Sequence, residues 1–186
     1  MPIAYTGLIL AGGRGTRAGG IDKGLAPFAG QPLVEYSIAA LSPFCQHLYI
    51  NCNRSHDRYR RYGLELISDP QGDFPGPLKA LGALLPLLPG QRFLLLPCDT
   101  PGVCPEHIRR LIHAAETYPD HWIYLRAAGR DHPLHACLPA ALVSQLQAFI
   151  QHTGEARLMR ALAALPSLGI ELEDSPQLNL NRPTGA

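Results

Sequence analysis

Residues 8–25, LILAGGRGTRAGGIDKGL, contain the feature that decides the fold of this chain. A short apolar run, typical of a buried strand, stops there at a segment rich in glycine and basic side chains. Glycine lets backbone N–H groups approach a ligand, and a turn of this kind after a strand can cradle phosphate groups. Arginine and lysine supply compensating charge. The segment predicts a triphosphate site formed by Gly12, Gly13, Arg14, Gly15, Arg17 and Lys23.

Two other interpretations of this segment stay open. GRGTRA (13–18) matches the dinucleotide pattern G-x-G-x-x-G/A, which is a weak signal by itself. In a dinucleotide fold the loop runs straight into a helix, whereas GGIDKG lengthens it here, and a backbone-bound pyrophosphate does not need three basic residues. The segment also fits a glycine-rich surface loop whose charges are solvated. The P-loop pattern G-x-x-x-x-G-K-[ST] is absent from the sequence.

The rest of the chain alternates apolar runs with amphipathic stretches. The expected strands are 6–11, 47–51, 64–68, 92–99, 121–127, 134–139 and 169–173. The expected helices are 32–44, 56–63, 76–88, 105–116, 140–151 and 155–165. This alternation predicts an α/β fold in three layers, with a mostly parallel sheet and helices on both faces.

Length and composition limit the function. The chain has 186 residues, 46% of them hydrophobic, and a net charge of +1. We therefore expect one domain with a buried core, and no bulk attraction to nucleic acid or membranes. The N-terminus shows neither the basic region of a signal peptide nor a long apolar segment. Five cysteines without a CxxC motif indicate reduced thiols in a cytoplasmic protein, with no zinc site expected.

Polar residues follow several of the predicted strands. Asn51, Asp69 and Asp99 stand at or just after strand ends, where open α/β sheets bind their ligands. A carboxylate such as Asp99, at the tip of a buried strand, suits Mg²⁺ shared with phosphate oxygens. The spacing allows equally that Asp99 caps the turn DTPG or the next helix.

The opening segment resembles the signature loop of the molybdenum cofactor guanylyltransferases (the MobA family). The resemblance continues in order through ISDPQGDFPGPLKALGALL, LLLPCDTPGVCPE, GRDHPLHACLP and NLNRPTG, so that it covers nearly the whole chain. It implies a Rossmann-like nucleotidyltransferase fold as a single domain over residues 1–186, and transfer of GMP from GTP to a molybdopterin phosphate with release of pyrophosphate. The chain departs from the family pattern at two places. It has Ala18 where methionine is common, and it ends at NRPTGA.

The resemblance implies roles for the nucleotide-side residues. Arg17 and Lys23 would neutralise the triphosphate and the departing pyrophosphate, and Asp99 would hold Mg²⁺. Asp69 would accept the N–H donors of guanine, although an ordinary turn residue fits the same position. Either Asn51 or Asn53 would face the nucleotide. The related cytidylyltransferases typically have LAAG where this chain has LAGG, and we expect Gly13 to favour the larger purine. The GTP site then comprises Leu10, Ala11, Gly12, Gly13, Lys23, Asn51, Asp69 and Asp99.

The pterin side is less sharply defined. By resemblance its residues are Pro77, Arg130, His132, Asn179 and Asn181. Asn181 stands where sugar nucleotidyltransferases have a second aspartate, which suggests one protein carboxylate for the metal. The partners implied are a pterin-loading protein and apo-molybdoenzymes or their chaperones. The alternatives are a molybdopterin cytidylyltransferase, a sugar-1-phosphate nucleotidyltransferase, and a nucleotide-binding docking or regulatory module without catalysis.

Overall fold

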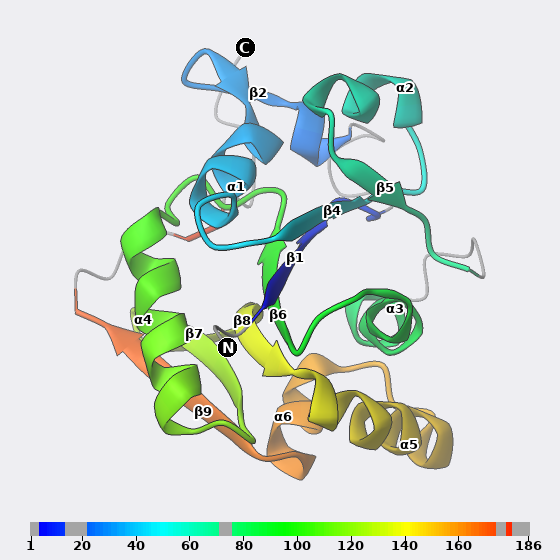
Figure 1. Ribbon diagram of the computed structural model, residues 1–186, viewed down its shortest axis with the longest axis vertical. Helices are drawn as coiled ribbons and strands as arrows, with labels where there is room; N and C mark the ends of the chain where they lie inside the picture. The colour runs from blue at the N-terminus through cyan, green and yellow to red at the C-terminus, as the bar shows by residue number, and fades with distance from the viewer. Residues whose placement is uncertain (1–3, 14–21, 71–75, 174–177, 180–186) are drawn as a thin grey trace.

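A seven-stranded sheet forms the centre of the protein (Figure 1). The computed structural model describes residues 4–13, 22–70, 76–173 and 178–179. Neighbouring strands in the sheet follow the order β5-β4-β1-β6-β8-β7-β9, and a separate pair, β2 and β3, forms a small hairpin. The strands are β1 (Tyr5–Leu10), β2 (Pro27–Phe28), β3 (Gln31–Pro32), β4 (His47–Asn51), β5 (Glu65–Ile67), β6 (Arg92–Pro97), β7 (Trp122–Ala127), β8 (Arg130–Pro139) and β9 (Ser167–Leu172).

Most strand pairs are parallel. β1 pairs in parallel with both β4 and β6, and β5 extends the same half of the sheet beside β4. β8 runs antiparallel to both of its neighbours, β6 and β7, while β9 lies parallel to β7 at the far edge. The predicted mostly parallel α/β sheet is confirmed, with β8 as its one reversed strand.

Helices cover both faces of the sheet. They are α1 (Leu33–Leu41), α2 (His56–Tyr59), α3 (Pro77–Leu84), α4 (Pro105–Thr117), α5 (Val143–Thr153) and α6 (Leu158–Ala164), with short 3-10 turns η2 (Lys23–Leu25), η3 (Arg60–Tyr62), η4 (Leu85–Leu87) and η5 (Ala140–Leu142). Figure 1 shows α1 and α4 on one face and α3, α5 and α6 on the other.

Each face has its own apolar core. Successive side chains of a strand point to opposite faces, and β1 shows this alternation. Ile9 packs with Leu111 in the cluster beneath α1 and α4. Leu8 packs with Leu81 and Leu146 in the cluster beneath α3 and α5. All five of these side chains are fully buried or nearly so. The three predicted layers therefore follow from two apolar faces of one sheet.

The element boundaries depart from the sequence prediction in instructive places. The predicted helix 76–88 ends at Leu84 and continues as the 3-10 turn that contains Pro86, because proline cannot donate the next helical hydrogen bond. The hairpin of β2 and β3 was not predicted.

β8 begins at Arg130, four residues before the predicted strand, and follows a tight turn in which Ala128 and Gly129 both have positive φ, of 50° and 69°. Such a turn matches the twist of two antiparallel strands.

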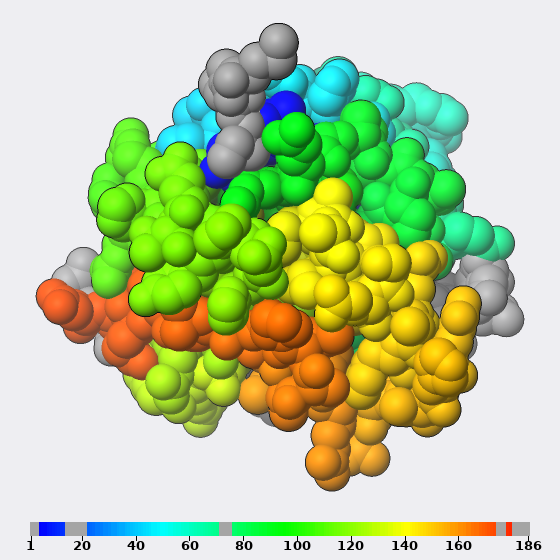
Figure 2. Space-filling view, turned by 60° about the horizontal axis from the view of Figure 1, so that its bottom comes forward, coloured from blue at the N-terminus to red at the C-terminus, as the bar shows by residue number. Residues whose placement is uncertain are grey.

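The edge of the sheet opposite β5 is visible in Figure 2. There the surface of α6 and β9, in orange, runs beside the green surface of α4. Within the described ranges, no helix has the length and apolar character needed to cross a lipid bilayer.

Candidate active site

The carboxyl ends of four parallel strands meet at one edge of the sheet. Leu10 at the end of β1 is paired with Asn51 on one side and with Pro97 on the other. Asn51 in turn is paired with Ile67 at the end of β5. The residues that follow these strands are therefore neighbours in space, as the sequence predicted for ligand binding at this edge.

A cavity of about 280 Å³ opens at this edge. Its walls are mostly apolar, with a few polar groups, which is the usual composition of a small-molecule site. Ala11 does not contribute its side chain, because that side chain packs into the core beneath α1 and α4. The residues lining the cavity are Leu10, Gly12, Gly13, Asn51, Asp69, Gly76, Pro77, Ala80, Pro97 and Leu134.

Two asparagines hold the buried carboxylate of Asp69. Asn51 Nδ2 donates to Asp69 Oδ1 at 3.0 Å, and Asn53 Nδ2 donates to Asp69 Oδ2 at 2.6 Å. Asn53 also accepts from the Asp69 backbone N–H at 2.8 Å and donates to the Gly12 carbonyl at 3.1 Å. Each carboxylate oxygen can accept more than one hydrogen bond, so Asp69 keeps acceptor capacity towards the cavity. Asn51 lines the cavity, whereas Asn53 braces Gly12 and Asp69.

Gly12 is the glycine that this network requires. A Cβ on Gly12 would lie 2.6 Å from Asn51 Oδ1 and 3.0 Å from Asn53 Nδ2, whereas a Cβ on Gly13 would meet no atom within 4 Å. LAGG and LAAG differ at their third residue, which is Gly12 in this chain. The comparison of LAGG with LAAG therefore applies to Gly12, and a purine preference set by either glycine stays a prediction. An added methyl group at residue 12 would have to displace the asparagine that holds Asp69.

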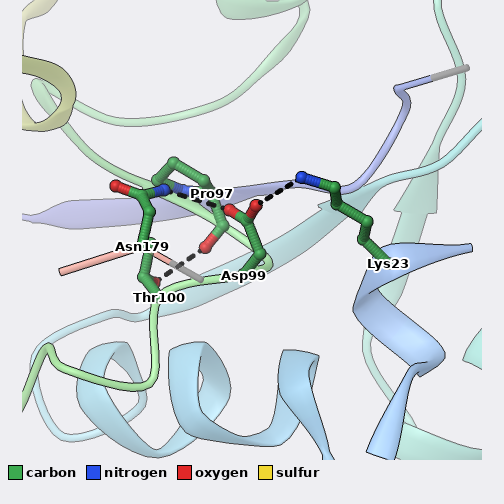
Figure 3. A network of polar contacts seen from close by, with 5 residues as sticks. All are labelled: Lys23, Pro97, Asp99, Thr100 and Asn179. Carbon is green, nitrogen blue, oxygen red and sulfur yellow. Dashed lines mark hydrogen bonds and ion pairs between the residues drawn. The ribbon is translucent and has the colours of Figure 1, made fainter. Parts of the chain in front are cut away.

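A second polar group lies around Asp99 (Figure 3). Lys23 Nζ lies 3.2 Å from Asp99 Oδ2, and Asn179 Nδ2 donates to Asp99 Oδ1 at 3.1 Å. The side chain of Asp99 is 14% exposed and that of Lys23 is 31% exposed, so the ion pair is only partly open to solvent. These three residues come from the loop after β1, the turn after β6 and the C-terminal segment. The fold therefore joins distant parts of the sequence at one carboxylate.

The turn that presents Asp99 is fixed by two buried hydroxyl groups. Thr100 Oγ1 and Ser37 Oγ each donate to the Pro97 carbonyl at 2.9 Å. Both side chains are fully buried, and their oxygens are 3.2 Å apart. Ser37 comes from α1 and was not singled out in the sequence, because nothing in its local pattern indicates a contact with residue 97. These bonds hold the backbone on both sides of Asp99, at Pro97 and at Thr100.

Asp99 fits the requirements of a hard cation such as Mg²⁺. Its two oxygens each have one partner and retain a further lone pair, and carboxylate oxygens are the ligands that Mg²⁺ prefers. In the described part of the chain, no group of three or more His, Cys, Asp or Glu side chains comes together to form a metal cage. A hard cation held by Asp99 could share its shell with phosphate oxygens and water.

The start of β8 brings further predicted residues to the same edge. Tyr124 of β7 pairs with Ala136, but the next residue, Leu125, pairs with His132, so three residues of β8 form a bulge. Bulges re-aim side chains. Leu134, within the bulge, lines the cavity. Arg130 is exposed at the first position of β8.

Of two neighbouring histidines, His132 borders this bulge and His135 lies within it. The rings of His132 and His135 meet edge to face, 5.2 Å apart. Burial lowers the pKa of His132, while its hydrogen bond with Asn179 opposes that shift and the charge of Arg130 adds to it. Burial, together with His132, lowers the pKa of His135 to about 3. Burial therefore favours the neutral form of both rings, and the hydrogen bond between His132 and Asn179 connects His132 to Asp99.

Several predicted residues lie outside the described residues. They are Arg14, Gly15, Arg17, Ala18 and Asn181. The two remaining pterin-side predictions reach the site from different sides: Pro77 lines the cavity, and Asn179 contacts Asp99.

Known proteins resemble the chain in sequence and in fold. The model of the MobA-like NTP transferase domain matches residues 7–166. A molybdenum cofactor guanylyltransferase of Pseudomonas syringae pv. syringae (strain B728a) is 42% identical over 95% of this chain and 88% of its own length. One from Pseudomonas syringae pv. tomato is 39% identical over the same shares. The crystal structure of molybdopterin-guanine dinucleotide biosynthesis protein A from Archaeoglobus fulgidus superposes with a TM-score of 0.75 at 22% identity, covering 96% of this chain and 93% of that one.

Proposed function

The chain belongs to the MobA-like NTP transferase family, and from this premise we propose that it transfers GMP from GTP to a molybdopterin phosphate and releases pyrophosphate. The observation that carries the proposal is the pairing of Lys23 with Asp99 at the sheet edge where the cavity opens. A cation and a carboxylate at that point suit a reaction in which phosphate charge is moved and neutralised.

The reaction needs alignment more than acid–base chemistry. An oxygen of the molybdopterin phosphate attacks the α-phosphorus of GTP, a new P–O bond forms, and the bond to pyrophosphate breaks. The attacking phosphate is already anionic near neutral pH, so no general base is required. Rate enhancement then comes from positioning and from charge stabilisation.

Lys23 and Asp99 have complementary roles in this proposal. The Lys23 ammonium, placed beside Asp99, would stabilise the triphosphate and the departing pyrophosphate, together with Arg17. Asp99 would hold Mg²⁺, which supplies Lewis-acid neutralisation of phosphate oxygens when it is bound. Asn179 would keep the Asp99 carboxylate in one orientation by occupying Oδ1.

Base selection would depend on Asp69. Guanine offers two neighbouring N–H donors, and the buried carboxylate held by Asn51 and Asn53 is a fixed acceptor for them. Gly12 leaves space for this arrangement, since any side chain there would collide with Asn51. GTP is therefore the proposed nucleotide. CTP would require a site in which residue 12 and Asn51 pack differently.

The pterin would occupy the side of the site formed by β8 and the C-terminal segment. Pro77, Arg130, His132, Asn179 and Asn181 are the proposed contacts. We propose in addition that the product passes to a pterin-loading protein, an apo-molybdoenzyme or its chaperone. All five cysteines are free thiols, which supports a reducing, cytoplasmic location for these steps.

Calorimetry with GTP, CTP, ATP and dTTP, with and without Mg²⁺, tests the nucleotide half of the proposal. Selective binding of GTP that strengthens with Mg²⁺ is expected. Release of pyrophosphate from GTP in the presence of molybdopterin then tests the transfer itself. Preference for CTP or dTTP would indicate a cytidylyltransferase or a sugar nucleotidyltransferase, and failure to bind any nucleotide would contradict the proposal.

A further inference from the structure

Tyr59 is a fully buried tyrosine whose hydroxyl group reaches the loop that carries Lys23. It is the last residue of α2 and has no exposed surface. A buried phenol needs a hydrogen-bond partner, and Tyr59 Oη donates to Asp22 Oδ1 at 2.7 Å. Burial is the main cause that raises the pKa of Tyr59, so the hydroxyl remains protonated and able to donate. Tyr59 is therefore a permanent donor to the residue directly before Lys23.

The same hydroxyl also contacts the residue directly after Lys23. A Cβ built on Gly24 would lie only 2.4 Å from Tyr59 Oη, so this oxygen occupies the space that any other residue would need. The backbone of this segment forms the η2 turn, in which the Leu25 and Ala26 N–H groups bond to the Asp22 and Lys23 carbonyls at 3.1 Å. Tyr59 therefore touches the turn on both sides of Lys23.

Gly24 also connects this turn to the strand end that carries Asp99. The point where its Cβ would stand is 3.2 Å from Cys98 Cβ and 3.3 Å from Cys98 Sγ. Cys98 directly precedes Asp99, and its N–H bonds to the Leu10 carbonyl at 3.1 Å. The glycine thus lets the turn approach the strand end closely. The distance between the Lys23 ammonium and the Asp99 carboxylate depends on this approach.

Asp22 would be a competitor for the Lys23 ammonium if it were not held. Its side chain is 8% exposed, and its second oxygen lies 4.0 Å from Arg54 Nε. A carboxylate next to Lys23 in sequence can pair with the ammonium as Asp99 does. The bond from Tyr59 orients Asp22 towards α2, so that Lys23 pairs with Asp99 across the site.

We propose that Tyr59 is a positioning residue for Lys23: its hydroxyl holds Asp22 and abuts Gly24, and so directs the Lys23 ammonium to the Asp99 carboxylate. The inference rests on the proposed nucleotidyl transfer for its effect on rate. Its structural content, the placement of one ammonium group, can be tested separately from activity.

A double-mutant cycle tests the effect on rate. Tyr59→Phe keeps the ring and removes only the hydroxyl, and we expect kcat for GMP transfer to fall roughly tenfold, because a small misplacement of a positioned group is costly, while KM for GTP changes little. In the Lys23→Ala background, Tyr59→Phe should have no further effect, since the residue through which it acts is gone. An equal fall in both backgrounds, or none in the wild-type background, would overturn the inference.

Amine labelling tests the placement without turnover. The chain has only two lysines, so exposed Lys79 serves as an internal reference. In Tyr59→Phe the rate of Lys23 acetylation relative to Lys79, measured by mass spectrometry, should rise because the ammonium is no longer held at Asp99. An unchanged ratio would overturn the inference even in an enzyme that transfers GMP.

Two further variants keep the result interpretable. Tyr62→Phe is the matched control, because the Tyr62 hydroxyl bonds instead to Glu35 at 3.1 Å and to Arg61 at 2.7 Å, and kcat and the labelling ratio should stay at wild-type values. Asp22→Ala removes the competing carboxylate itself, so adding Tyr59→Phe to that variant should leave the labelling ratio unchanged. Wild-type protein that releases no pyrophosphate from GTP would contradict the proposed function, whereas active wild type with unaffected variants would contradict only the role of Tyr59.

Discussion

Lys23 and Asp99 are 76 residues apart in the sequence, yet the ammonium of one lies 3.2 Å from the carboxylate of the other. Lys23 follows β1 and Asp99 follows β6, and these strands are direct neighbours in the sheet. The carboxylate proposed to hold a metal is thus already paired with a cation. A triphosphate bound at this edge would lie close to both groups, so that the ammonium and a cation held by Asp99 could neutralise the same phosphate charge.

Asp99→Asn is expected to abolish GMP transfer while leaving the fold intact. The amide has the shape of the carboxylate and can still accept from Asn179, but it lacks the charge that a hard cation requires. Pyrophosphate release and circular dichroism would measure the two effects. A turnover rate near that of the wild type would show that Asp99 does not hold the metal.

Lys23→Ala should weaken GTP binding. Removing one ammonium from a triphosphate site costs a charge-assisted contact, and we expect Kd to rise roughly tenfold, equivalent to about 1.4 kcal/mol. Lys79→Ala is the matched control, since it removes the other lysine from an exposed position on α3. If calorimetry gave the same Kd for both variants, Lys23 would instead be a loop residue whose charge is solvated.

Gly12→Ala should impair GTP binding far more than Gly13→Ala. The new methyl group at residue 12 would be 2.6 Å from Asn51 Oδ1 and would force apart the pair that orients Asp69, whereas residue 13 has open space around it. Overpacking of this kind also costs about 1–3 kcal/mol of stability. Calorimetry with GTP and CTP, beside thermal unfolding, would compare the variants. Equal GTP affinities would contradict the assignment of the pocket to Gly12 and Asn51.

His135 should make the protein less stable in mild acid. The pKa of this buried ring is lowered from 6.5 to about 3, so the unfolded chain binds a proton across that interval and the folded chain does not. Stability is therefore full above pH 6.5 and falls as the pH drops towards 3, by about 2 kcal/mol between pH 6.5 and 5. His135→Phe, which preserves an aromatic contact with His132, should remove this part of the loss.

Urea unfolding at several pH values would measure that effect. The difference in unfolding free energy between wild type and His135→Phe should vary with pH below 6.5 and be constant above it. Parallel pH profiles for the two proteins would show that His135 is protonated in the folded state or does not govern acid stability.

Local sequence patterns predicted much of the architecture but few of the contacts. The strand at 47–51 matches β4 at both ends, because its apolar centre is bounded by the polar residues His47 and Asn51. β8 was only half predicted, because Gly129 and Pro133 interrupt the pattern, although one forms the turn and the other lies in the bulge. The reversal of β8 depends on that turn and could not be inferred from alternation alone.

The candidate site was also predicted only in part: the sequence indicated the residues at strand ends but not the contacts between separate elements. Placement of Asn51, Asp69 and Asp99 after strands follows from local pattern and from the geometry of parallel sheets. The support of Pro97 by Ser37, and the contact of Tyr59 with Asp22, join residues 60 and 37 positions apart. No periodicity or motif encodes such pairs, since they arise only when separate elements pack together.

The reversed strand β8 has a consequence for how this fold can diversify. The nucleotide-side residues follow the parallel strands β1, β4, β5 and β6, whereas His132 and Leu134 come from β8. Among the described residues, the bond between Asn179 and Asp99 links the C-terminal segment to the nucleotide side. Substitutions at the exposed start of β8 would therefore alter the proposed pterin side first, whereas a substitution of Asn179 would also reach the Asp99 carboxylate. A nucleotidyltransferase of this architecture could change its acceptor through β8 only while that bond is kept.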